Sequence, residues 1–135
     1  MLAAVIVLAL TGCQKARADP VQFSLDKPFV LGGGQEAALA GHELSLRFAR
    51  VLEDSRCPAL VACFWTGQAR IAIVARSDGH DSTAEFNTNP APNMTVTSVR
   101  VDGYTVVLES LDPYPQSPQD RIELEEYRAT LLVRA

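Results

Sequence analysis

The thiols of Cys57 and Cys63 are the side chains whose type and spacing suggest chemistry most directly. Two thiols so close along the chain can form a disulfide or contribute to a metal site. A structural zinc site usually needs four ligands with tight spacing, and the two histidines of the chain, His42 and His80, are scattered. The pattern favours a disulfide, and the compartment of the protein bears on the choice.

A third cysteine, Cys13, follows a short apolar segment. Residues 2–10 are all apolar and uncharged, a length typical of a signal-peptide core and too short to span a bilayer. The sequence Leu10-Thr11-Gly12-Cys13 then resembles the bacterial lipobox. This resemblance implies cleavage before Cys13 and a diacylglycerol on its thiol, with several acyl chains giving stable anchoring. The alternative is an ordinary apolar strand or helix.

The lipobox divides the chain into three parts. Residues 1–12 are predicted to be a lipoprotein signal peptide, residues 13–19 a lipid-anchored polar tether, and residues 20–135 the folded domain. We therefore expect a lipid-anchored protein of the bacterial cell envelope. Gln14, rather than Asp, follows the cysteine, which favours the outer membrane, facing the periplasm, if the cell is Gram-negative.

Export also bears on the two remaining thiols. In an oxidising compartment a Cys57–Cys63 disulfide is expected. Closing a loop of about seven residues stabilises a fold by roughly 2.4 kcal/mol in the chain-entropy model. A metal site or a reactive thiol pair is the alternative.

These cysteines belong to the most informative segment of the chain. It reads Asp-Ser-Arg-Cys-Pro at 54–58 and Cys-Phe-Trp-Thr-Gly at 63–67, before an alternating strand. The pattern resembles that of a family of small exported bacterial proteins, many of them lipoproteins and most uncharacterised. Residues 104–108, the Pro-Tyr-Pro at 113–115 and the final strand are similar to that family too. The resemblance covers most of the mature chain and implies no particular activity.

The same segment has the residues of a clamped loop. Arg56 beside Asp54 can form an ion pair, the disulfide can close the loop, and Trp65 offers a large apolar face. Such a loop can fix two strands of a β domain, act as a rigid recognition surface, or do both. The candidate binding residues are Asp54, Arg56, Trp65 and Tyr114, the last standing between two prolines.

Patterns for other chemistry are weak. The glycines at 32–34 lack the Gly-Lys-Ser/Thr of a phosphate loop, and no Gly-x-Ser-x-Gly elbow occurs. The acidic run at 123–126 lacks EF-hand spacing. With 12 Lys+Arg, 16 Asp+Glu and a formal net charge of -4, the chain is too acidic for general nucleic-acid binding. We expect no nucleic-acid partner, no enzymatic activity, no metal, and no cofactor beyond the lipid on Cys13.

Short apolar alternations separated by Gly, Pro, Asn and Asp predict strands. Residues 44–48 alternate clearly, and the alternation slips near Ala49 and Arg50, which predicts a bulge. Residues 68–75 are apolar on both faces, as in a central strand. Residues 119–127 are expected to form a turn of helix at most. Further strands are expected at 21–25, 29–31, 37–39, 83–87 and 127–133, with a loop at 87–93.

Asp102-Gly103 is the strongest local signal. A two-residue turn there would pair Val101 with Tyr104 and Val99 with Val106, all on one face. About eight short strands with turn signals every eight to twelve residues predict an all-β fold, a single antiparallel β-sandwich. An immunoglobulin-like topology is the default, and a small β-barrel is the alternative.

These observations together predict a non-catalytic β-sandwich that binds a protein or another envelope component. The 54–65 loop and the loop around Tyr114 are the expected contacts. Two alternatives remain open: a protease inhibitor that presents the Cys57–Cys63 loop to an active-site cleft, and a metal-binding protein.

Overall fold

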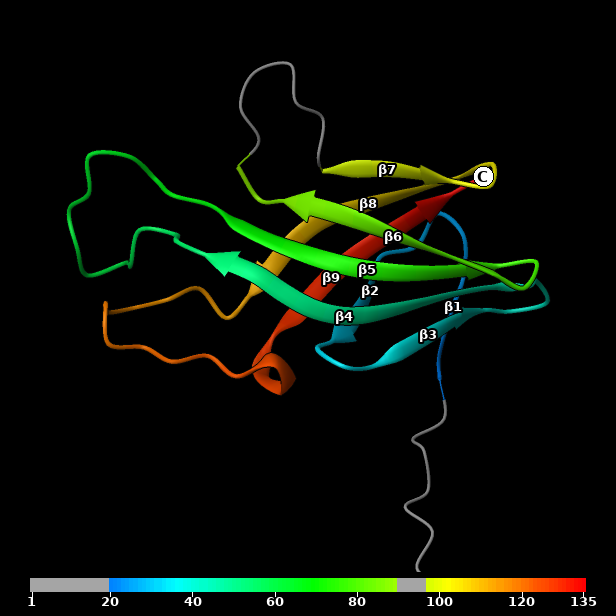
Figure 1. Ribbon diagram of the computed structural model, residues 1–135, viewed down its shortest axis with the longest axis horizontal. Helices are drawn as coiled ribbons and strands as arrows, with labels where there is room; N and C mark the ends of the chain where they lie inside the picture. Colours follow the sequence, from blue (N-terminus) through cyan, green and yellow to red (C-terminus); the bar gives the residue numbers. More distant parts are fainter. Residues whose placement is uncertain (1–19, 90–96) are drawn as a thin grey trace, which may run out of the picture.

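The structure is a computed structural model that describes residues 20–89 and 97–135. In these residues the chain is all-β, with two sheets and one short 3-10 helix (Figure 1). The elements are β1 (Val21–Phe23), β2 (Phe29–Gly32), β3 (Glu36–Leu39), β4 (Leu44–Asp54), β5 (Ala69–Ser77), β6 (His80–Asn87), β7 (Ser98–Val101), β8 (Tyr104–Asp112), η1 (Leu124–Glu126) and β9 (Arg128–Arg134).

The sheets form a sandwich and do not close into a barrel, which confirms the predicted fold class. One sheet has the order β1-β3-β4-β5-β6 and the other β2-β9-β8-β7. The pairs are antiparallel apart from β1 and β3, which are parallel. Strands β3 to β6 follow chain order in one sheet and β7 to β9 in the other, so the sheets are not interleaved as in immunoglobulin domains. Short connections join β3 to β4, β5 to β6 and β7 to β8, whereas longer segments join β4 to β5 and β8 to β9.

The core lies between the inner faces of the two sheets. Alternating residues of β4, β5 and β6 face alternating residues of β2, β8 and β9, as the period of two in a strand requires. Strand β5 has a neighbour on each side, as predicted for 68–75. The largest fully buried side chains are Phe48, Phe86, Leu31, Leu44, Leu46, Ile71, Ile73, Leu131, Val106 and Val133.

The local predictions with the clearest signals are confirmed. Val101 pairs with Tyr104 and Val99 with Val106 around Asp102-Gly103, both of which have positive φ. The register of β4 shifts after Phe48, at the predicted bulge. A second shift follows before the end of the strand. Helical structure near residue 124 is limited to the single turn of η1.

Among the strand boundaries that differ from the sequence expectation are those of β1 and β6. Strand β1 ends at Phe23, before Leu25, which packs half-buried against the core from a turn. Strand β6 begins at His80 rather than at residue 83. The reason is a two-residue turn at Asp78-Gly79, which lets pairing start at once between Ser77 and His80.

Several expectations fall outside the described residues. The predicted signal peptide at 1–12, Cys13 and the tether at 13–19 are among them, as is the end of the 87–93 loop. In the parts of the chain that the structure describes, no helix is long and apolar enough to cross a bilayer.

Candidate functional site

One end of the sandwich gathers most of the residues singled out in the sequence (Figure 1). The 55–68 loop joins β4 to β5 there, and the 113–127 segment joins β8 to β9. Asp54, the last residue of β4, pairs with the fully buried Ala69. Directly paired residues share a face of the sheet, so the carboxylate of Asp54 lies on the inner face, at the edge of the core.

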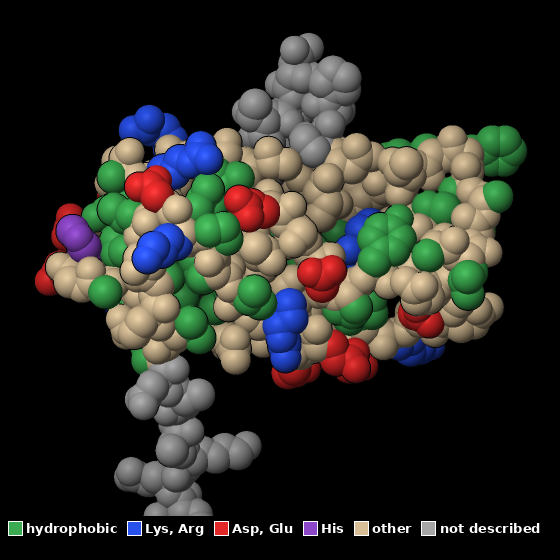
Figure 2. Space-filling view, turned by 180° about the vertical axis from the view of Figure 1, so that it is seen from behind, with side chains coloured by type: hydrophobic (Ala, Val, Ile, Leu, Met, Phe, Trp, Pro, Cys, Tyr) green, Lys and Arg blue, Asp and Glu red, His purple; other side chains and the backbone are tan. Residues whose placement is uncertain are grey.

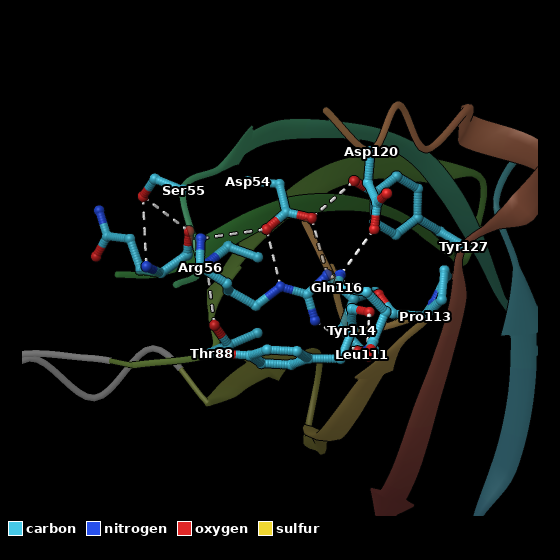
Figure 3. A network of polar contacts seen from close by, with 12 residues as sticks. Asp54, Ser55, Arg56, Thr88, Leu111, Pro113, Tyr114, Gln116, Asp120 and Tyr127 are labelled. Atoms are coloured by element: carbon cyan, nitrogen blue, oxygen red, sulfur yellow. Dashed lines mark hydrogen bonds and ion pairs between the residues drawn. The ribbon is translucent and has the colours of Figure 1, made fainter. Parts of the chain in front are cut away.

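The side chains of Asp54 and Arg56 form a bidentate ion pair at this edge (Figure 3). Arg56 Nε donates to Asp54 Oδ1 and Nη2 to Oδ2, both at 2.8 Å. Arg56 also donates from Nη1 to the carbonyl of Leu111 at 2.8 Å and from Nη2 to that of Pro113 at 2.9 Å. The two side chains are only 5% and 13% exposed. Because Leu111 and Pro113 belong to the other sheet and its following loop, this pair ties the two sheets together.

Tyr127 completes this polar network from the residue before β9. Its buried hydroxyl donates to Asp54 Oδ2 at 2.8 Å. Burial by itself raises the pKa of Asp54, but the hydrogen bonds from Arg56 and Tyr127 outweigh it, so the pKa lies below the ordinary value. Burial and the Asp54 carboxylate raise the pKa of Tyr127. In this network Asp54 is therefore an ionised carboxylate, Arg56 a charged guanidinium and Tyr127 a neutral phenol.

The loop beyond Asp54 continues the β4–β5 ladder before the disulfide closes it. Ser55 N–H donates to the carbonyl of Gln68 at 2.7 Å, and Cys57 N–H to that of Thr66 at 2.8 Å. The Cys57–Cys63 disulfide, with the Cα atoms 6.0 Å apart, confirms the sequence prediction. Gly67 has a φ of 68°, and a Cβ there would lie 1.9 Å from the carbonyl oxygen of Ser55. Only glycine fits this close approach.

The clamped loop also rests on the segment after β8. Tyr114 donates its hydroxyl to the Cys57 carbonyl at 2.7 Å, and the guanidinium carbon of Arg56 lies 5.1 Å from the centre of the Tyr114 ring. The N–H groups of Ala59 and Leu60 donate to the carbonyls of Pro115 and Gln116, each at 3.0 Å.

The supporting segment is itself ordered by Asp120. The Asp120 carboxylate accepts hydrogen bonds from the N–H groups of Gln116 and Ser117 and from the Ser117 hydroxyl, at 2.7, 3.1 and 2.9 Å. These bonds, the one from Gln116 first, lower the pKa of Asp120. The loop is thus fastened by a covalent bond and by contacts to a second ordered loop.

Large apolar side chains protrude from this clamped structure. Phe64 is fully exposed, Leu60 is 79% exposed and Trp65 is 60% exposed, with Val61 beside them. We call these four residues the apolar tip. In Figure 2, which views the molecule from behind, hydrophobic side chains stand out at the right-hand end, which carries this loop. Several large apolar side chains exposed on one loop are typical of interaction sites.

A shallow open groove of about 420 Å³ runs beside the tip. Its walls combine apolar surface with hydroxyl, amide and carboxylate groups. The lining residues are Arg56, Thr66, Gly67, Thr88, Asn89, Ser110, Leu111, Asp112 and Tyr114.

The structure divides the four candidate binding residues into two kinds. Asp54 and Arg56 are buried and bonded to one another, so they position the loop. Trp65 and Tyr114 reach solvent. Sequence reasoning did not identify Leu60 and Phe64 as exposed contacts, although both lie in an uncharged run from Cys57 to Ala69 that could have indicated them.

Sequence reasoning also missed the role of Tyr127 in the network. Its apolar alternation with Ala129 predicted a strand and nothing about its hydroxyl. With regard to metals, both thiols of the central motif are in the disulfide. Among the described residues, no group of three or more His, Cys, Asp or Glu is arranged to hold an ion.

Comparisons with protein-family models, with curated proteins and with solved structures find no match to this chain. The functional argument therefore rests on the residues and on their geometry.

Proposed function

We propose that this protein is a lipid-anchored, non-catalytic binding module of the bacterial envelope, with the apolar tip as its contact surface. The observation that carries this proposal is the exposure of Leu60, Phe64 and Trp65 on a loop held by a disulfide and by the Asp54–Arg56 pair. A rigid loop loses little conformational entropy on binding, so its apolar contacts add directly to affinity.

The charged residues of the motif support a binding role over a catalytic one. The Arg56 guanidinium donates to Asp54, Leu111 and Pro113, and the Asp54 carboxylate accepts from Tyr127 as well. These bonds explain why Arg and Asp are needed at these positions. They serve the shape of the loop, and the exposed residues are left to make contact.

The contact role is tested by sedimentation with isolated bacterial envelopes. The core extends from Phe23 to Val133, so residues 14–135, made in an oxidising compartment, contain the whole folding unit. We expect this protein to sediment with the envelopes, and the Leu60→Ser/Phe64→Ser variant to remain in the supernatant. Val30→Ser, which changes an exposed apolar residue of the other sheet, is the matched control. Equal sedimentation of all three proteins would contradict the proposal.

The anchor is tested separately, in cells given a labelled fatty acid. The full chain should carry the label and fractionate with membranes, and Cys13→Ala should carry none. A wild-type chain without label would contradict the proposed lipid anchor.

The two alternatives are tested with the same purified protein. Inhibition of a protease that requires the intact Cys57–Cys63 loop would favour an inhibitor. Elemental analysis showing bound zinc or copper, together with two free thiols by intact mass, would favour a metal-binding protein.

A further inference from the structure

The chemistry of the apolar tip indicates what it contacts. The run from Cys57 to Ala69 contains thirteen residues and no charged side chain. It contains the aromatic residues Phe64 and Trp65, both exposed. Trp is enriched at membrane–water interfaces, where its ring lies among the headgroups and its N–H stays hydrated.

We propose that the apolar tip inserts into the interfacial region of a lipid bilayer, as a second membrane contact in addition to the lipid anchor. The inference rests on the proposed function, because it names the component that the tip binds. The four residues of the tip are uncharged and reach solvent from a loop closed by a disulfide. A fluid interface can take up each of these side chains separately.

The first half of the loop, from Cys57 to Val61, has its backbone N–H groups bonded within the protein. The N–H groups of Cys57, Ala59, Leu60 and Val61 donate to carbonyls of Thr66, Pro115, Gln116 and Pro58, at 2.8 to 3.0 Å. The intervening Pro58 has no N–H. A backbone N–H that loses water without a partner costs several kcal/mol, so these internal bonds lower the cost of inserting this half of the loop.

The charges around the tip specify the kind of bilayer. Glu53 accepts a hydrogen bond from Ser55, Asp112 lines the neighbouring groove, and Asp120 orders the supporting segment. These carboxylates lie on the loop end of the molecule, where Glu53 is paired with Arg70, and the one arginine of the loop, Arg56, is buried in its pair with Asp54. The tip therefore suits zwitterionic headgroups, and anionic lipids should not strengthen the contact.

The tether makes even a weak contact effective. Pro20 lies seven positions after Cys13. At about 3.4 Å per residue these seven steps span at most about 24 Å, so an anchored domain stays close to the membrane surface. Insertion of the tip is then intramolecular and occurs at a high effective concentration.

Trp65 is the only tryptophan of the chain, so its fluorescence reports on the tip directly. Residues 14–135 are titrated with vesicles of pure phosphatidylcholine. We expect a blue shift of the emission and protection from acrylamide, and about tenfold weaker partition for Phe64→Ser. Leu60→Ser should weaken partition to a smaller extent, and Val30→Ser should bind as the wild type does.

The outcomes separate this inference from the proposed function. If vesicles cause no spectral shift while binding to envelopes still depends on the tip, the inference that the tip inserts into a bilayer is wrong. The tip would then be assigned to a pocket in a protein. Binding that requires phosphatidylglycerol and disappears in salt also overturns it, because the attraction would then be electrostatic. Failure with both vesicles and envelopes contradicts the proposed function as well.

Discussion

At one end of the sandwich, strands β5 and β6 and strands β7 and β8 are joined by the two-residue turns Asp78-Gly79 and Asp102-Gly103. At the other end, β4 and β5 are joined by residues 55–68, and β8 and β9 by residues 113–127. We call these the turn end and the loop end; they lie at the right and left of Figure 1.

The two ends are stabilised in different ways. At the turn end, each turn is defined by its own residues, since a Cβ added at Gly79 or Gly103 would meet nothing within 4 Å. At the loop end, Arg56 is held by residues that lie more than fifty positions further along the chain. Binding surfaces in β proteins often lie on loops presented by a rigid scaffold, and here the scaffold extends into the loop itself.

The largest expected effect on the loop end comes from Arg56→Met. It leaves the Asp54 carboxylate without its ion-pair partner and the Leu111 and Pro113 carbonyls without their donor. We expect the free energy of unfolding to fall by about 3–5 kcal/mol, the range for removing one partner of a buried pair. Urea unfolding followed by circular dichroism measures it.

The control for Arg56→Met is Arg70→Met on the exposed face of β5. Arg70 pairs with Glu53 and Glu85, and solvent reaches all three side chains. Arg70→Met should lower the free energy of unfolding much less than Arg56→Met does. Equal losses would show that burial of the Asp54–Arg56 pair is not what stabilises the loop end.

The second test compares glycines at the two ends. Gly67→Ala adds a Cβ against the Ser55 carbonyl at positive φ, and we expect at least about 2 kcal/mol of destabilisation. Gly79→Ala has the same backbone strain in open space and should cost about 1 kcal/mol. Denaturant midpoints of the two variants decide the order, and a larger loss for Gly79→Ala would contradict the structure.

The third test removes the covalent clamp. The Cys57→Ser/Cys63→Ser variant should lose roughly 2.4 kcal/mol, the chain-entropy value for a loop of about seven residues. Intact mass with and without reduction confirms the bond in the wild type, where alkylation without reduction should add nothing at these two thiols. If the variant is as stable as the wild type, the Asp54–Arg56 pair alone holds the loop.

The smallest effect concerns pH. Because the pKa of Asp54 is lowered in the fold, its contribution is present above its ordinary value of 3.8 and is lost as the pH falls through the folded value. The pKa of Tyr127 is raised, so its contribution is present below 10.0 and is lost as the pH rises toward the folded value. The measurement is the free energy of unfolding as a function of pH. Tyr127→Phe should make its decrease at acid pH and its decrease at alkaline pH less steep. Tyr104→Phe at the turn end should leave the decrease at acid pH unchanged.

Much of the fold could be predicted because its signals are local. The alternation of Val99 and Val101 before Asp102-Gly103, and of Tyr104 and Val106 after it, specifies both the turn and the face of the hairpin. The bulge after Phe48 and the central position of β5 were readable for the same reason. The order of strands in the two sheets was not readable, because it depends on which strand edges hydrogen-bond to one another and on which sheet each strand joins.

The candidate site was only partly predictable. Its residue types and the Cys57–Cys63 disulfide followed from spacing and an expected oxidising compartment. Nothing local showed that Arg56 is buried while its neighbour in the motif, Trp65, is exposed. A side chain is buried or exposed according to the segments packed against it, and these come from other parts of the chain.

The sequence alone therefore determined where most strands and tight turns lie and which two thiols pair, since most of these signals come from residues within about ten positions of one another. Only the tertiary structure decided what the central motif does. The hydrogen bonds from Arg56 to Leu111 and Pro113, and from Tyr127 to Asp54, join residues 55 to 73 positions apart. Such contacts exist only once the two sheets have packed, and they turn the Asp54–Arg56 pair inward while leaving the apolar tip exposed.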